Sequence, residues 1–245
     1  MGTFFVDLRE TFIPDMRGKH GPLPPLLVAM TLVTGLVDAF SYLVLGHVFV
    51  ANMTGNVVLL GFALAGAPGF SISASAAAII SFGLGALIGG RTSTQLNEHR
   101  GRILSTTAGM QTILLAVSVV LAAVSDHPVT AGYRYSLIAV LAFSMGIQNA
   151  AARKLAVPDL TTTVLTMTIT GITADSAVAG GKGSKAGRRS IAIAAMLAGA
   201  LVGAVLVIHV EIFYPLLIAL VIIATVAGAT AKLGKAQLAW VEPAS

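Results

Sequence analysis

Asp38 is the first candidate for chemistry, because it carries the only formal charge between His20 and Gly90. An ionisable side chain inside a membrane span costs at least about 2.5 to 3.5 kcal/mol on insertion scales, so it rarely lacks a role. Burial disfavours the ionised carboxylate, and Asp38 could therefore bind a proton or a cation beside Tyr42, one turn further on. The alternative is a structural acceptor bonded to nearby hydroxyls and amides.

Two polar clusters interrupt apolar stretches further along the chain. They are Asn52, Thr54 and Asn56 in the first half and Asp159, Thr161 and Thr163 in the second. A helix that begins at such a break directs free backbone N–H groups and its positive dipole end toward a polar or anionic ligand. Ordinary N-capping is the alternative reading, because Asn, Thr and Asp are common capping residues.

The second half carries amides where the first carries its acid. Gln148 and Asn149 align with Val37 and Asp38, and this asymmetry favours a single coupling or binding site near a pseudo-two-fold axis. Asp175 lies near a basic loop and is expected to form a surface ion pair.

Composition defines the broad class of protein. Of the 245 residues, 56% are hydrophobic and 10% are charged, whereas soluble domains carry about 25% charged residues. The basic residues fall in short clusters between apolar runs, which indicates a lipid bilayer as partner and excludes a nucleic-acid partner. The absence of Cys excludes disulfides and thiolate chemistry. No enzymatic signature occurs, so we expect neither an enzyme, nor a cofactor, nor a metal site.

Eight apolar segments follow an N-terminal amphipathic arm over residues 1–22. They run from Leu26 to Leu45, Val50 to Ala67, Ile72 to Gly90, Ile103 to Val124, Tyr135 to Ala152, Leu160 to Thr173, Ile191 to Ile208 and Ile212 to Ala231. We expect a single membrane domain over residues 23–232 and a C-terminal tail over 233–245. Every segment favours a helix, so the predicted fold class is an all-α membrane bundle.

Three short matches recur in the same order in both halves and predict an internal repeat, with halves of about 24–124 and 133–231. Gly35 to Ala39 corresponds to Gly146 to Ala150, and Asn52 to Val57 corresponds to Asp159 to Val164. The third match pairs two Gly-x-x-x-Gly motifs, whose glycines allow helix backbones to approach closely in lipid. These packing glycines are Gly85, Gly89, Gly199 and Gly203.

The basic clusters predict the topology, since Lys and Arg near span ends prefer the cytoplasmic side. All five clusters fall on one side if the segment from Leu160 and any one of the first three segments fail to cross, and the repeat selects the segment from Val50 as the partner of that from Leu160. Six full spans and two broken or re-entrant segments then remain, with Arg134 as the exception outside and both termini in the cytoplasm. Three crossings per half would invert the second half, as in many secondary transporters. Eight crossings with parallel repeats is the alternative.

The run from Gly35 to Tyr42, followed by Phe49 to Asn56, resembles the signature of the YoaK-like bacterial membrane proteins, a family catalogued as domain of unknown function 1275. Gly146 to Ala150 and Asp159 to Thr163 are similar to the second motif of that family. The resemblance extends from about Pro24 to Ala231. It implies a multi-pass protein of the bacterial cytoplasmic membrane with about six spans, and it supplies no substrate.

These observations favour a small secondary transporter of a polar or anionic solute, with Asp38 as the coupling group and the two broken segments forming the polar site. A channel or passive facilitator, working as a homo-oligomer, is the second hypothesis. A membrane scaffold without flux is the third.

Overall fold

The computed structural model describes residues 2–13, 15–16, 18–97, 99–125, 128–160, 162–163, 165–180, 186–234 and 239–242. Within these residues every regular element is helical, which confirms the predicted all-α fold. The elements are α1 (Gly2–Phe12), α2 (Leu23–Val44), α3 (Met53–Leu64), α4 (Ile72–Gln95), α5 (Arg100–Val124), α6 (Ala131–Leu155), α7 (Thr166–Ala174), η1 (Ala177–Ala179), α8 (Ala186–His209), α9 (Tyr214–Leu233) and η2 (Ala239–Val241).

Six of the described helices, namely α2, α4, α5, α6, α8 and α9, are long and apolar enough to cross a membrane. The other two predicted segments are short: α3 has 12 residues and α7 has 9. At about 1.5 Å per residue, neither reaches across a hydrocarbon core of about 30 Å. The expectation of six spans is confirmed for the described residues, and the alternative of eight is not.

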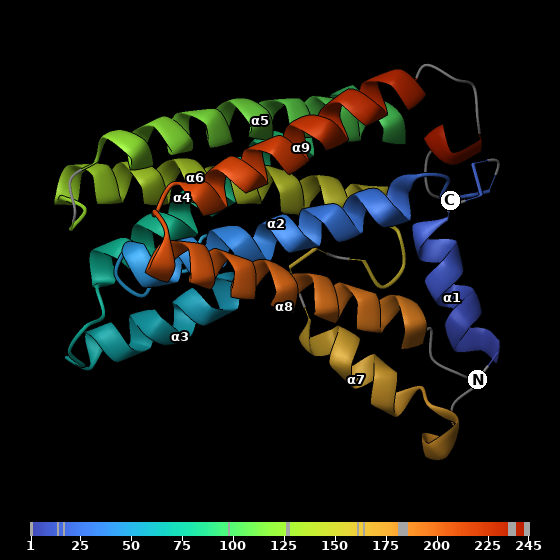
Figure 1. Cartoon of the computed structure of the whole chain (residues 1–245), viewed down its shortest axis with the longest axis horizontal. Helices are drawn as coiled ribbons and strands as arrows, with labels where there is room; N and C mark the ends of the chain where they lie inside the picture. The colour runs from blue at the N-terminus through green and yellow to red at the C-terminus, as the bar shows by residue number, and fades with distance from the viewer. Residues whose placement is uncertain are drawn as a thin grey trace.

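The central helices of the bundle are α2 and α6. Their most apolar windows are 61% buried, against 28–33% for the other four spans. Helix α8 packs along α2, α4 packs along α6, and α5 pairs with α9. Helices α5 and α9 lie along one side of the bundle, whereas α3 and α7 lie on the opposite side and run toward opposite ends (Figure 1). The buried aliphatic core therefore forms around α2 and α6.

Glycines set the two closest helix contacts. A Cβ atom added to Gly85 would overlap the carbonyl oxygen of Phe143 on α6, and one added to Gly199 would overlap that of Leu32 on α2. The glycines one turn later, Gly89 and Gly203, also face these central helices closely. All four motif glycines are thus used inside one chain, and a homo-oligomer would have to associate through other surfaces.

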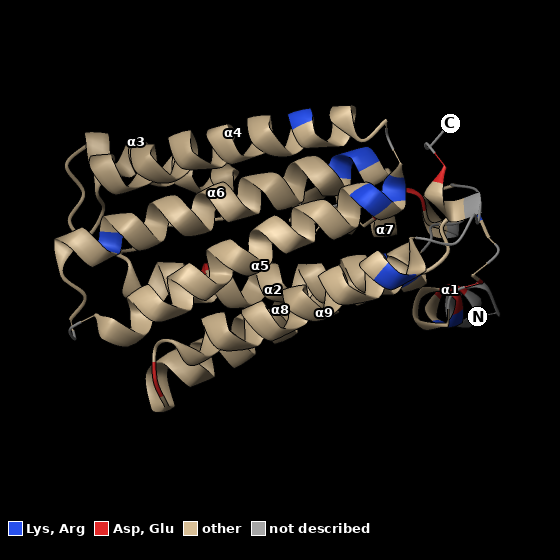
Figure 2. Cartoon of the chain, turned by 90° about the horizontal axis from the view of Figure 1, so that it is seen from above, with Lys and Arg blue, Asp and Glu red and all other residues tan. Residues whose placement is uncertain are grey.

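Most Lys and Arg residues gather at the end of the bundle where both termini lie (Figure 2). Buried Arg100 ties this end together, because its guanidinium donates to the carbonyl oxygens of Lys19 (2.8 Å) and Leu155 (2.5 Å). Arg134, at the start of α6, lies at the opposite end, near Gly46. Six crossings and this distribution agree with the predicted charge pattern.

The terminal segments cover the basic end. Helix α1, within the predicted arm of residues 1–22, contacts α8 and α2. Trp240 of η2 is fully buried, and its indole lies so close to Gly21 that a Cβ there would overlap the ring. The domain limits at residues 22 and 232 stay a prediction.

Candidate functional site

Helices α3 and α7 begin next to a shared cavity of about 410 Å³, which we call the tip cavity. It is lined by Asn52, Thr54, Gly55, Val58, Thr163, Leu165, Thr166, Ile169 and Met196. The first four residues belong to the start of α3, the next four surround the start of α7, and the last comes from α8. The structure therefore brings the predicted residues Asn52, Thr54 and Thr163 together, while Thr161 lies outside the described residues.

The start of α3 is fixed by a local cap. Asn52 occupies the N-cap position, and its side-chain oxygen accepts a hydrogen bond from the backbone N–H of Gly55 at 3.1 Å. A Cβ on Gly55 would come within 2.8 Å of the Phe49 ring. The break in the apolar pattern thus becomes a tight helix start at the cavity.

Helix α7 begins differently from the prediction. It starts at Thr166, and Leu165 occupies its N-cap position without a side-chain hydrogen bond. The expectation that the cluster around Asp159 caps this helix is therefore wrong. Ala156, Asp159 and Thr162 all have positive φ values, which a helix does not accommodate, so no helix runs through these three residues.

Asp38 is buried in α2 and holds the segment before α3. Its Oδ1 accepts hydrogen bonds from the backbone N–H groups of Val50 (3.0 Å) and Ala51 (2.8 Å). Both residues precede the Asn52 cap, so this carboxylate positions one side of the tip cavity. Asp38 therefore has the structural acceptor role that was the alternative reading, with backbone amides as its partners.

A second cavity of about 360 Å³ lies beside Asp38 between α2 and α8. It includes Tyr42 and shares Asn52 and Met196 with the tip cavity. Tyr42 stacks on Phe49 with ring centroids 4.9 Å apart. The acid and the tyrosine thus lie next to the tip cavity without lining it.

Asn56 faces the segment before α3 instead of the tip cavity. Its side chain is fully buried, and it accepts from the Phe49 N–H (2.9 Å) and donates to the Phe49 carbonyl oxygen (2.6 Å). These two bonds satisfy both backbone polar groups of Phe49, as a neighbouring strand would. Asn56 therefore supports the irregular segment and does not line the cavity.

Gln148 lies in the centre of the bundle, away from the tip cavity. It accepts from Gln111 of α5 (3.0 Å) and donates to the Thr34 hydroxyl of α2 (2.9 Å). All three side chains are fully buried. This chain of hydrogen bonds joins three helices, and Gln148 is thereby separated from the other predicted site residues.

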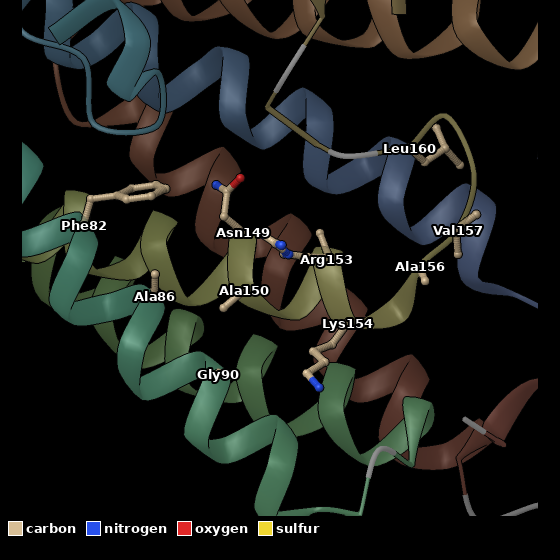
Figure 3. Close-up of a pocket in the computed structure, with 11 residues that line it drawn as sticks. Phe82, Ala86, Gly90, Asn149, Ala150, Arg153, Lys154, Ala156, Val157 and Leu160 are labelled. Carbon is tan, nitrogen blue, oxygen red and sulfur yellow. The ribbon is translucent and has the colours of Figure 1, made fainter. Parts of the chain in front are cut away.

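Asn149, the counterpart of Asp38, holds the segment before α7. Its side-chain oxygen accepts from the Thr163 hydroxyl at 2.5 Å, and its amide donates to the Met145 carbonyl oxygen at 3.0 Å. Asn149 also lines a third cavity, of about 890 Å³, between α4 and α6 (Figure 3). Because Thr163 lines the tip cavity, the Asn149–Thr163 bond links the two cavities.

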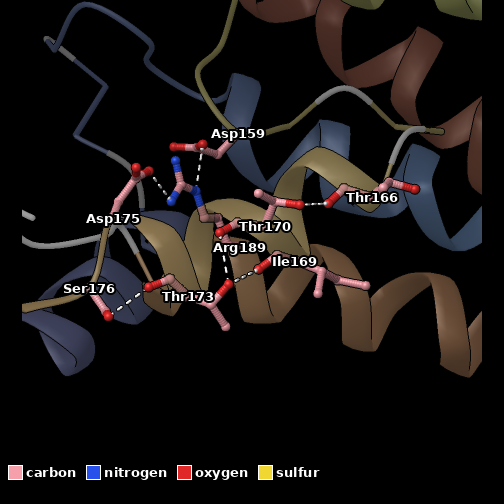
Figure 4. Close-up of polar contacts among 8 residues, drawn as sticks. All are labelled: Asp159, Thr166, Ile169, Thr170, Thr173, Asp175, Ser176 and Arg189. Carbon is pink, nitrogen blue, oxygen red and sulfur yellow. Dashed lines mark hydrogen bonds and ion pairs between the residues drawn. The ribbon is translucent and has the colours of Figure 1, made fainter. Parts of the chain in front are cut away.

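Arg189 of α8 anchors both ends of the α7 region (Figure 4). Its Nε lies 2.8 Å from Asp159, before α7, and a terminal nitrogen lies 2.8 Å from Asp175, which directly follows α7. The Asp175 side chain is 54% exposed, whereas those of Arg189 and Asp159 are 14% and 17% exposed. The expected ion pair of Asp175 is confirmed.

Six of the nine residues that line the tip cavity, Met196 among them, were not among the predicted site residues, and neither was Arg189. Arg189 comes at the end of the basic stretch after Asp175, and its partners Asp175 and Asp159 lie 14 and 30 positions away, so no local spacing points to them. Met196 is one of many apolar residues, and in the sequence only its position three residues before Gly199 sets it apart. Among the described residues, no cluster of three or more His, Asp or Glu forms a candidate metal site.

Among the described residues, six apolar spans and two short helices whose starts share one cavity define a multi-pass α-helical membrane protein. Residues 26–229 match the family described as "Protein of unknown function (DUF1275)", and the chain belongs to this family. It is 36% identical over 155 residues to the UPF0700 transmembrane protein YoaK of Bacillus subtilis (strain 168), a match that covers 61% of this chain and 65% of that relative. No solved structure matches the chain. The predicted family resemblance is confirmed.

Proposed function

We propose that this protein is a small secondary transporter of a polar or anionic solute, without an enzymatic step. The observation that carries the proposal is the tip cavity, where two short helices present their N-terminal ends to one space. Free N–H groups at helix starts favour anionic or polar groups. Irregular backbone at membrane depth is also found where it lines a site, as in transporters with discontinuous helices.

Alternating access requires two halves that can exchange roles, and equivalent contacts support this. Gly85 of α4 packs on the carbonyl of Phe143, and Gly199 of α8 packs on that of Leu32. Phe143 and Leu32 each lie three residues before the first glycine of the repeated Gly35 and Gly146 motifs. We therefore treat the halves as an inverted repeat, in which α4 rocks with α6 and α8 rocks with α2.

Asp38 supplies a route for coupling. An ionised carboxylate holds N–H donors about twice as strongly as a neutral acceptor does. Proton binding at Asp38 would weaken its hold on the N–H groups of Val50 and Ala51. The segment that positions Asn52 would then move more freely, and solute access would depend on the proton.

The charge distribution supports an orientation. The end of the bundle that holds both termini and most Lys and Arg residues would face the cytoplasm, as the positive-inside preference requires. We place the protein in the bacterial cytoplasmic membrane on this basis and by analogy with its family. Helix α3 would then approach the tip cavity from outside and α7 from inside.

Single cysteines test the mechanism before any solute is known, because the chain contains no Cys. Thr54→Cys and Thr166→Cys report on the two sides of the tip cavity, and a water-soluble, impermeant thiol reagent is added to either face of proteoliposomes. A carrier predicts modification of Thr54→Cys from outside and of Thr166→Cys from inside. Val57→Cys, on the exposed apolar side of α3, is the lipid-facing control that should stay unmodified.

Two outcomes would contradict the carrier. Modification of both positions from both faces at once would indicate an open channel. Modification of neither position from either face would indicate a dry interior, as expected for a scaffold without flux.

Asp38→Asn tests the coupling group. Asn keeps an acceptor oxygen for the two backbone N–H groups but cannot ionise. Labelled phosphate, acetate and glycerol are offered to proteoliposomes in turn. For whichever of them the parent protein transports, a proton gradient should drive uptake, and uptake by the variant should no longer depend on that gradient. Glu211→Gln, in the exposed turn after α8, is the matched control. Uptake by Asp38→Asn that still follows the proton gradient would remove this residue from the coupling step.

A further inference from the structure

The cavity of about 890 Å³ between α4 and α6 has a composition that neither the tip cavity nor the cavity beside Asp38 shares. Its walls are formed by Phe82 and Ala86 of α4, Asn149 and Arg153 of α6, and Val157 and Leu160 of the segment before α7. We call it the inner cavity, because it lies toward the basic end of α6. A volume of this size falls within the range of about 300 to 1,000 Å³ that is typical of small-molecule sites.

The polar groups of the inner cavity are donors suited to an anion. Asn149 and Arg153 lie four residues apart on α6 and so share one face of that helix, as Figure 3 shows. Lys154 also lines the cavity, whereas no carboxylate is among its described lining residues. An arginine guanidinium offers several N–H donors in a planar fork that fits carboxylate and phosphate groups.

The remaining wall is apolar. Phe82, Ala86, Val157 and Leu160 line the cavity. Val157 and Leu160 are already almost fully buried, so the apolar surface open to a ligand belongs to the half-buried Phe82 and Ala86. A small hydrated anion would leave these surfaces without a partner. An anion with an apolar body would cover them and would regain the hydrophobic contribution of about 25 cal/mol per Å² of buried apolar surface.

The corresponding cavity of the other half supports this assignment by contrast. It holds Asp38 where the inner cavity holds Asn149, and Tyr42 where the inner cavity holds Arg153. An acid at that place repels an anion, while the inner cavity attracts one. The two halves therefore offer opposite electrostatic environments at equivalent positions.

We infer that the inner cavity binds an amphipathic organic anion, with its carboxylate or phosphate on Arg153 and its apolar body against Phe82 and Ala86. This inference rests on the proposed function and extends it by naming the class of solute. The Asn149–Thr163 hydrogen bond would transmit occupancy to the tip cavity. A soluble metabolite and an anionic lipid share this chemistry.

The test uses the full-length chain in nanodiscs of phosphatidylcholine, with octanoate as the probe. The readout is the rate at which a maleimide modifies Ala86→Cys, which lies in the cavity wall. Octanoate should slow modification, whereas acetate, which lacks the apolar body, and octyltrimethylammonium, which has the opposite charge, should not. Arg153→Gln should raise the half-protecting octanoate concentration about tenfold or more, because hydrogen bonds to charged groups contribute about 1.5 to 3 kcal/mol.

Arg102→Gln removes an exposed cation at the same end of the bundle that does not line the cavity, and it should leave protection unchanged. Nanodiscs containing phosphatidylglycerol separate the two sources: protection without octanoate identifies a membrane lipid, and protection only by octanoate identifies a soluble anion. Either of these two outcomes supports the inference. Equal protection by octanoate and octyltrimethylammonium, or an unchanged midpoint in Arg153→Gln, would overturn it. Because binding is measured without flux, its failure is distinguishable from failure of transport.

Discussion

At the scale of single residues, Arg100 connects three segments at the basic end. Its side chain is buried, yet it lies at the start of α5 and reaches carbonyl oxygens of Lys19, before α2, and of Leu155, at the end of α6. The last carbonyls of a helix have no partner within that helix. Arg100 therefore caps α6 and fixes the entry to α2 with one side chain.

Arg100→Met should destabilise the protein while keeping a similar side-chain volume. The Leu155 carbonyl loses its partner in a buried place, where an unsatisfied group costs about 1 to 3 kcal/mol, and the part-buried bond to the Lys19 carbonyl is lost as well. The expected result is a lower Tm for detergent-solubilised protein, measured by scanning fluorimetry. Arg102→Met, on the exposed side of the same helical turn, should change Tm little. An equal loss of stability in both variants would contradict the capping role.

At the scale of elements, α7 depends on Arg189 more than on its own packing. Only Thr168 and Gly171 of this helix are buried, and it is too short to be stable alone. Arg189 holds the chain before it and after it through Asp159 and Asp175. The helix start that lines the tip cavity is thus fixed by an ion-pair network on α8.

Weakening this network should expose α7. In an Arg189→Gln background, a cysteine placed at buried Thr168 should react about fivefold faster with a thiol reagent, since partly exposed ion pairs contribute up to about 1 kcal/mol. Asp159→Asn should have a larger effect than Asp175→Asn, because the side chain of Asp159 is 17% exposed and that of Asp175 is 54% exposed. Unchanged reactivity in all three backgrounds would show that α7 is held by other contacts.

At the scale of the whole molecule, the two closest helix pairs are built in the same way. Gly85 lets α4 approach α6, and Gly199 lets α8 approach α2. Each contact joins a span from residues 24–124 to one from residues 133–231, so each central helix has one closely packed partner of the same kind. Rocking of one pair against the other would preserve these contacts, because each glycine moves with the helix that it touches.

Gly85→Ala should destabilise the fold, whereas Gly83→Ala, two residues away on α4, should not. The added methyl group meets the Phe143 carbonyl at position 85 and open space at position 83. Overpacking costs about 1 to 3 kcal/mol, while an exposed helical Gly→Ala change gains up to about 1 kcal/mol. Urea or thermal unfolding in detergent measures both. Gly199→Ala should match Gly85→Ala, and a tolerated change at 199 would argue against equivalent halves.

The sequence was sufficient to predict the spans and the broken segments, because hydropathy and the placement of basic residues act locally. It also singled out Asn52 and Thr163, which the fold brings to one cavity. It could not reveal the partners of Asp38, which are backbone N–H groups 12 and 13 residues away in an irregular segment. The α7 start was misplaced, because positive φ values at Ala156 and Asp159 and a distant Arg189 override local capping preferences.

The gathering of basic residues at one end has a consequence for biosynthesis. In the proposed orientation, the growing chain reaches the outer side after the first three crossings, and Arg134 is then the first cation of the next part to leave the ribosome. By itself, Arg134 would favour the opposite membrane orientation for the segment that follows. Arg153 and Lys154, made one helix later, must outweigh it during insertion by the translocon. Neutralising both Arg153 and Lys154 should therefore yield a mixture of membrane topologies, whether or not the protein transports a solute.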